Sequence, residues 1–309
     1  MKLFNVPCPR FWLMSAILML HSATVACAQS GPADSDAVAR AALAALGVAA
    51  LPGGSSSTLS VDSANGENVD FFSTRIGGGF DAGEDGKLHF EGYLVYQNYS
   101  PIYLLPTADP TFIDVRWSSL AATVGVGRNY EFAEGLVLRP SALATVGHVF
   151  GKAILDGLLP SSFNAAQREQ FEDGLFVGGY GGSLTLEFER QIGEGAVDLR
   201  ARQSWMRFVP LNESLSASSI ASSTSLFGEY SRPLRDNTGL SGVLEASYTH
   251  FWGDQSQILR TDWLGTIGAG IEFPTPAGTP AGLSTGRLIL RYAVGEGYDG
   301  LSLGISLAF

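Results

Sequence analysis

Residues 301–309, Leu-Ser-Leu-Gly-Ile-Ser-Leu-Ala-Phe, decide the fold class. Large apolar residues alternate in this stretch with small or polar ones, so an extended strand carries one apolar face and one mixed face. The same period of two governs residues 285–294 and 175–190, and it holds over most of the chain beyond Thr58. The sequence therefore predicts an all-β protein.

Twelve strands account for the alternating segments, and an even number places both ends of a barrel on the same side. The predicted strands span residues 57–64, 68–80, 87–98, 117–128, 135–150, 175–190, 195–208, 217–232, 239–252, 261–273, 285–294 and 299–309. A soluble β-sandwich alternates in the same way, so the period alone does not separate the two architectures.

Three details favour a transmembrane antiparallel up-and-down β-barrel. The strands are long enough for a tilted membrane crossing of about 9–11 residues, whereas sandwich strands are usually shorter. The apolar runs end in aromatic residues, as interfacial girdles require: Phe80, Tyr96, Tyr130, Trp205, Phe208, Tyr230, Trp252, Trp263 and Phe273. The polar face carries charges of both signs in mid-strand, as a narrow lumen requires. The candidates for a lumen charge network are Arg75, His89, Glu91, Glu187, Glu189, Asp198, Arg200, Arg202, Arg287 and Arg291, and Glu229, Glu245 and Glu272 lie on the same face.

The connections between strands give an independent check, because outer-membrane barrels have short periplasmic turns and longer outer loops. Four connections expected to be short are residues 81–86, 129–134, 191–194 and 233–238, and four expected to be long are 99–116, 151–174, 209–216 and 253–260. The last two connections break the rule, since 274–284 is long and 295–298 is short. Either a miscount near the C-terminus or an unusual periplasmic loop explains them.

The first 28 residues read as a secretory signal peptide. Lys2 and Arg10 are basic, residues 11–20 are apolar, and Ala-Cys-Ala at 26–28 is a small-x-small cleavage site, so we expect cleavage after Ala28. The alternatives are a signal anchor, for which the apolar run is short, and a lipoprotein signal with Cys27 as the lipidated residue. The signal predicts export through the periplasm.

Removal of residues 1–28 changes the composition. It takes away Cys8 and Cys27, the two cysteines of the chain, which excludes disulfides, thiolate metal ligands and a thiol nucleophile from the mature form. The mature chain then has seventeen basic and thirty acidic residues, and its net charge of −13 argues against a nucleic-acid partner. We expect neither a cofactor nor a metal.

A helical pattern precedes the first strand. Residues 35–46 are rich in Ala and Leu, Gly47 is a natural stop, and residues 52–57 form a Pro, Gly and Ser linker. The predicted organisation is a signal peptide over 1–28, a helix and linker over 29–56, and a barrel over 57–309. A helix this short needs a surface to pack on, and the lumen offers one.

Four features make residues 34–309 resemble an autotransporter-type outer-membrane β-barrel in its solitary, passenger-less form. They are the turn and strand start at 132–140 (Phe-Ala-Glu-Gly-Leu-Val-Leu-Arg-Pro), the twelve strands, the helix before the first strand, and the terminal alternation of Leu303, Ile305, Leu307 and Phe309. The resemblance implies that the helix threads the pore, and that the outer-membrane assembly machinery reads the terminal signature. About 28 residues separate the cleavage site from the first strand, which leaves no room for a secreted passenger.

Histidines are the candidates for chemistry. His89 and Glu91 share one face of a strand, and a His–carboxylate pair can act as a general base. His148 lies near an outer rim and His250 beside an expected girdle. An outer-membrane enzyme that hydrolyses lipid or peptide is therefore an alternative, although we favour a lumen salt-bridge network for His89 and rim positions for the other two.

The charged row of Asp198, Arg200 and Arg202 faces Glu187 and Glu189 across a short turn. Cross-strand pairing is the structural interpretation, and an ion-selecting constriction is the functional one. We expect a monomer in outer-membrane lipid that serves as a structural barrel, a small pore or a surface receptor. A soluble periplasmic β-protein remains the third hypothesis.

Overall fold

A computed structural model describes residues 35–50, 57–63, 70–83, 86–100, 102–105, 111–153, 174–211, 217–234, 239–259, 261–274, 285–296 and 298–308. All of them belong to one compact unit, Pro32–Phe309. The signal peptide, its cleavage site, the linker, most of the 151–174 connection and Phe309 lie outside the described residues. Neither described helix is long and apolar enough to cross a membrane.

The described chain forms two helices and fourteen strands. They are α2 (Ser35–Ala50), β1 (Ser57–Ser63), β2 (Asp70–Ala82), β3 (Leu88–Ser100), β4 (Ile102–Leu105), β5 (Thr111–Arg128), β6 (Tyr130–Ala133), β7 (Leu136–Ala153), β8 (Leu175–Ile192), β9 (Gly195–Pro210), β10 (Ser219–Pro233), β11 (Ser241–Gly253), α4 (Asp254–Leu259), β12 (Trp263–Pro274), β13 (Thr285–Gly295) and β14 (Tyr298–Ala308).

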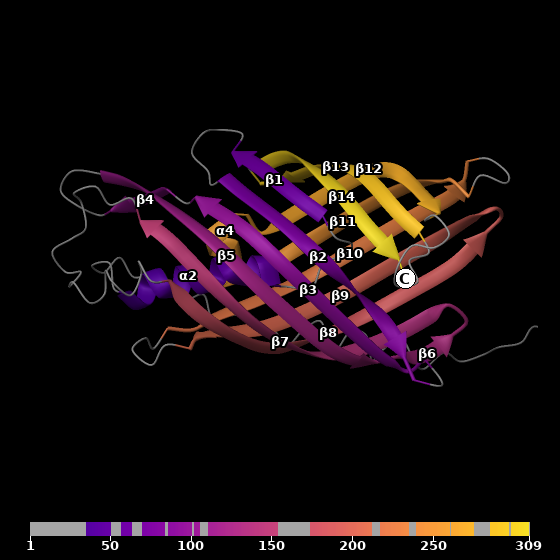
Figure 1. The fold of residues 1–309 in the computed structure, drawn as a ribbon, viewed down its shortest axis with the longest axis horizontal. Coiled ribbons are helices and arrows are strands. Elements are labelled where there is room, and N and C mark those ends of the chain that lie inside the picture. The colour runs from indigo at the N-terminus through magenta and orange to yellow at the C-terminus, as the bar shows by residue number, and fades with distance from the viewer. Residues whose placement is uncertain are drawn as a thin grey trace, which may run out of the picture. The chain divides into compact units, whose positions relative to one another are not determined.

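The strands close into a ring in which each neighbour is antiparallel (Figure 1). Consecutive strands pair from β7 to β14, β14 pairs with β1, and β1, β2, β3, β5 and β7 complete the circle. Within the described residues, closure gives each of these strands a partner on both sides, which is the condition for a sheet in a membrane.

Two of the fourteen strands are continuations of their neighbours. β4 extends β3 against β5 in an unchanged register, and β6 extends β5 against β7. Pro140 lies opposite the break between β5 and β6, where it has no N–H to donate to the ladder. The barrel therefore has twelve strands around its ring, and the predicted all-β up-and-down fold is confirmed.

The outer face of the barrel is apolar. Large side chains alternate along each strand with the lumen-facing ones and stay exposed, with Ile267 at 66% and Leu301 at 62% of their free surface. Phe208 is a correction to the predicted girdle. It is fully buried and faces the lumen, because it follows Ser204 and Met206 on the inner side of β9.

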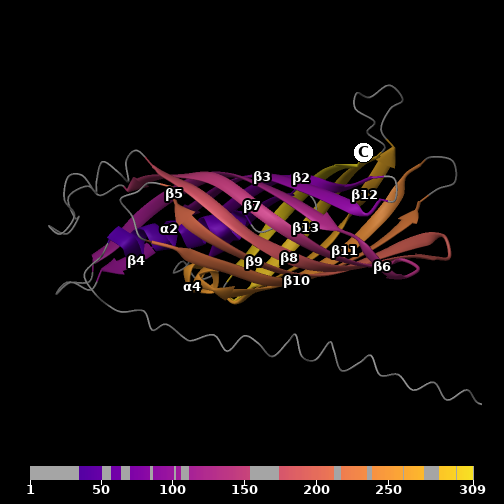
Figure 2. The ribbon, with the colours of Figure 1, turned by 90° about the horizontal axis from the view of Figure 1, so that it is seen from below.

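Helix α2 lies inside the ring, at the end that also holds α4 (Figures 1 and 2). It packs against β3, β5, β7, β9, β10 and α4. The helix runs to Ala50, four residues beyond its predicted end at Leu46. Gly47 therefore does not stop the helix. A side chain at this position would come within 2.8 Å of Ala221 Cβ and 3.2 Å of Phe208 Cε2. Glycine is kept inside the helix for close packing, at a cost in helix propensity.

The two ends of the barrel differ. The loop end holds α4, and the turn end holds the two-residue hairpins at Glu134–Gly135 and Gly193–Glu194. The count of twelve is correct, so miscounting does not explain the two irregular connections. Pro274 pairs directly with Thr285 at the turn end, and Gly295 with Tyr298 at the loop end. The turn end therefore carries one long connection.

Gly135 and Gly193 allow a matched test of the hairpins. Both adopt left-handed backbone, with φ of 72° and 63°. A side chain at Gly193 meets open space, whereas one at Gly135 overlaps the carbonyl oxygen of Glu189. We expect Gly193→Ala to lower the free energy of unfolding by about 1 kcal/mol, the backbone cost alone. Gly135→Ala should cost at least about 1 kcal/mol more, from the overlap. Urea unfolding in lipid vesicles measures both, and equal losses would contradict this account.

Candidate functional site: the plugged lumen

The half of the lumen near the loop end is apolar. Leu43 and Leu46 of α2 are fully buried there. Their surroundings are lumen-facing residues from six strands together with one residue of α4: Ala121, Leu143, Val149, Leu175, Val177, Met206, Phe208, Ala221, Phe251 and Leu259. A polar contact also anchors the helix, since Gln97 Nε2 donates to the Ala45 carbonyl over 2.9 Å. This half of the lumen is built as a hydrophobic core around a helix.

The connection between β11 and β12 closes the mouth over α2. It contains α4, whose Gln255 is fully buried and would lie 3.4 Å from a side chain at Gly47. Asp254 Oδ2 accepts hydrogen bonds of 3.0 Å from Ser219 Oγ and from the Ile220 backbone N–H, which fixes the start of α4. The sequence predicted residues 253–260 only as a long connection, and it gave no sign of α4.

Charged side chains line the half of the lumen near the turn end. Arg139 and Arg200 both bind Glu187, with N–O distances of 2.9 and 3.1 Å. Arg200 also binds Asp198 on its own strand. These contacts join residues on the same or adjacent strands, so they run along the wall.

Other pairs reach over intervening strands. Arg202 on β9 binds Glu91 on β3, and Arg287 on β13 binds Glu229 on β10 over 2.8 Å. Arg291 binds Glu245 across β12. Gly268 of β12 lies between this last pair, and a side chain there would come within 2.9 Å of Arg291 and 3.1 Å of Glu245. Lumen glycines therefore make room for long ion pairs.

The remaining charged candidates also face the lumen. The Arg75 guanidinium lies 6.0 Å from the Tyr93 ring, within reach of a cation–π contact. His89 is buried beside Glu91 on the lumen face of β3, but its Nδ1 lies 2.6 Å from Asp81 Oδ1 on β2. The structure thus pairs His89 with Asp81, and not with the Glu91 that the general-base alternative would use.

His148 and His250 point outward among aromatic rings. His148 stacks on Phe176 with ring centroids 4.2 Å apart, and His250 contacts Trp252 edge-on at 4.2 Å. Both belong to the aromatic surface of the barrel near the loop end, as rim residues do.

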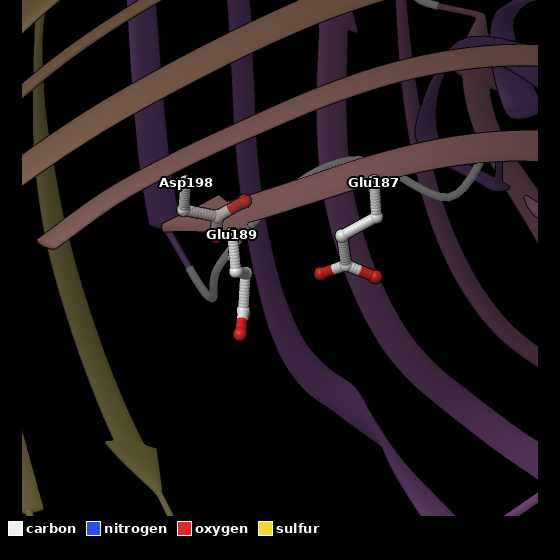
Figure 3. Close-up of side chains that lie close together, drawn as sticks. All are labelled: Glu187, Glu189 and Asp198. Carbon is white, nitrogen blue, oxygen red and sulfur yellow. The ribbon is translucent and has the colours of Figure 1, made fainter. Parts of the chain in front are cut away.

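Three carboxylates gather near the turn end, those of Glu187, Glu189 and Asp198 (Figure 3). One oxygen from each lies within 4.8 Å of the others, which is a spacing that a cation could bridge. Arg139 and Arg200 already neutralise part of this charge, because both bind Glu187. Two cavities of about 800 and 350 Å³ open beside the group and share Arg200, Glu229 and Arg287 in their walls.

No known protein family and no curated protein matches the sequence. Among solved structures, the chain is similar to the β-domain of the Bordetella autotransporter BrkA, at 14% identity and a TM-score of 0.50 over 82% of this chain and 97% of that one. The translocator domain of the autotransporter NalP from Neisseria meningitidis is 12% identical, with a TM-score of 0.47 over 91% and 99% of the two chains. The transport unit of AIDA-I from Escherichia coli is 15% identical, with a TM-score of 0.47 over 82% and 88%.

The fold is that of an autotransporter-type β-barrel, as the resemblance seen in the sequence predicted. At this level of identity the similarity concerns architecture. What the lumen does in this chain depends on its own residues.

Proposed function

We propose that the chain is an integral protein of the bacterial outer membrane whose barrel is closed at rest, and that it acts as a structural and surface-exposed barrel rather than as a diffusion pore. The packing of α2 supports this most directly. Leu43 and Leu46 are fully buried among apolar lumen residues, and α4 packs over the helix. A helix held in this way would obstruct the loop end of the lumen.

The apolar outer face supports the membrane location. Its exposed side chains match the lipid band of an outer-membrane barrel, and the loop end corresponds to the cell exterior if longer loops face outward. On this proposal the protein is a monomer, and its partners are outer-membrane lipid and the outer-membrane assembly machinery. The machinery would read the terminal signature during insertion. The side chains of Ile305 and Leu307 lie outside the described residues.

Planar-bilayer recording tests the closed state. We expect the full chain to give no steady current, because the apolar plug excludes water and ions from the loop end. A separate heat-shift on a denaturing gel establishes that the inserted protein is a folded barrel. Steady open-pore conductance from protein that shows the heat-shift would refute the proposal.

We also propose that His89 is structural. Its imidazole is held by Asp81 inside the lumen, whereas an enzyme acting on lipid or protein would need a group that its substrate can reach. His89→Ala and the unaltered chain should be equally inactive in lipid- and peptide-hydrolysis assays. Activity that disappears in His89→Ala would favour the enzyme alternative.

A further inference from the structure

The ion pair between Glu91 and Arg202 crosses the lumen. Glu91 is on β3 and Arg202 on β9, and β5, β7 and β8 lie between them in the ring. Their side chains therefore join two strands that lie four positions apart in the ring of twelve. A contact over that span is a chord through the interior, unlike the pairs that run along the wall.

The pair is fixed at both ends. Arg202 Nη1 and Nη2 each donate to one oxygen of Glu91 over 2.9 Å, which is the bidentate geometry of a strong Arg–carboxylate pair. Arg202 Nη2 also donates to Ser183 Oγ over 2.7 Å, and the Tyr93 hydroxyl donates to Glu91 Oε2 over 3.1 Å. Additional hydrogen bonds of this kind are what a buried ion pair needs to offset desolvation.

Gly125 provides the room for the crossing. It faces the lumen on β5, the strand next to Glu91, and a side chain there would come within 2.6 Å of Glu91 Cγ and 2.7 Å of Leu143 Cδ2. The Glu91 side chain is 2% exposed and that of Arg202 is 15% exposed. The pair is therefore buried inside the lumen.

The crossing pair lies on the turn-end side of the plug. Along β5, lumen-facing Ala121 belongs to the apolar core around α2, Thr123 follows, and Gly125 adjoins Glu91. Thr123 is 1% exposed, and its hydroxyl lies 2.7 Å from that of Thr145 on β7. A short buried layer thus separates the apolar plug from the ion pair.

We propose that Glu91 and Arg202 form a second closure of the lumen. It bars water-soluble molecules that enter the lumen from the turn end before they reach α2. The proposal deepens the closed-barrel function and rests on it, since one barrier then faces each end. Arg202 and Glu91 fix the positions of each other's side chains. Ser183 and Tyr93 hold the pair by hydrogen bonds, and Gly125 leaves room for it.

Thiol accessibility at Thr123 tests this closure in the full chain with Cys8→Ser, Cys27→Ser and Thr123→Cys. A charged methanethiosulfonate reagent is added to the detergent-folded protein, and the labelling rate is measured by mass. We expect slow labelling, and at least tenfold faster labelling when Arg202→Gln breaks the crossing. Arg232→Gln is the matched control, because Arg232 binds Glu194 at the exposed turn end, outside the lumen.

Two further variants keep the outcome decisive. If Arg202→Gln fails to show the heat-shift of a folded barrel, Glu91→Gln breaks the same pair with an isosteric side chain. The exchange Glu91→Arg with Arg202→Glu should restore slow labelling. Equal labelling rates with and without the pair would overturn the second closure. If the bilayer recording is still silent, the α2 plug stands. Fast labelling together with steady current would overturn both proposals.

Discussion

Leu46→Asp is expected to remove α2 from the lumen. Leu46 is fully buried among apolar groups, so a carboxylate there would lose its hydration without gaining a partner. Loss of the leucine packing alone costs about 2–5 kcal/mol, and the buried charge adds to this. We therefore expect the free energy of unfolding to fall by about 4 kcal/mol or more, or the helix to leave its socket.

Arg40→Asp is the control for this prediction. Arg40 is exposed on the same helix, so the substitution introduces the same carboxylate without burying it. Surface substitutions of this kind change stability by about 0.5 kcal/mol at most. Urea unfolding in lipid vesicles measures both variants, and protease cleavage within residues 35–50 reports whether the helix has left. Similar behaviour of the two variants would show that α2 is not held by apolar packing.

The apolar socket could be inferred only in part from the sequence. Residues 41–50 of the helix contain no polar side chain, which a polar lumen would not accommodate. The strand ends near the loop end carry apolar residues on both faces, as in Leu175-Phe176-Val177. Read together, these patterns indicate a buried helix. Phe208 was misassigned because an aromatic residue at a strand end fits an interfacial girdle equally well.

The strands and tight turns were predictable because they depend on local sequence. Alternation of small and large residues fixes which face points out of the barrel, and Glu134-Gly135 provides the backbone that a two-residue hairpin needs. The crossing pair was not predictable, because 111 residues separate Glu91 from Arg202 in sequence. Their meeting depends on ring closure and on the stagger of the strands, which no local pattern specifies. His89 was paired with Glu91 for the same reason, since its actual partner Asp81 is set by the register of β2 and β3.

Leu290→Arg is expected to have a large effect if the outer face meets lipid. Leu290 is the middle residue of β13, is 58% exposed, and pairs with Leu303 and Ala269 on the neighbouring strands. An arginine at the bilayer midplane costs a barrel about 2–4 kcal/mol, because lipid cannot solvate the charge. We expect a loss of this size in urea unfolding from lipid vesicles.

Depth separates this effect from a general intolerance of arginine. Phe132 is 67% exposed on β6 beside the Glu134–Gly135 turn, where the proposed membrane barrel would meet the interface. Phe132→Arg should cost about 0–1 kcal/mol, because the guanidinium reaches water and headgroups. A soluble β-barrel with the same exposed leucine would instead be unaffected or gain solubility from Leu290→Arg. Only a lipid-facing strand makes the central substitution costly and the peripheral one nearly neutral, so the difference between the two variants tests the membrane assignment directly.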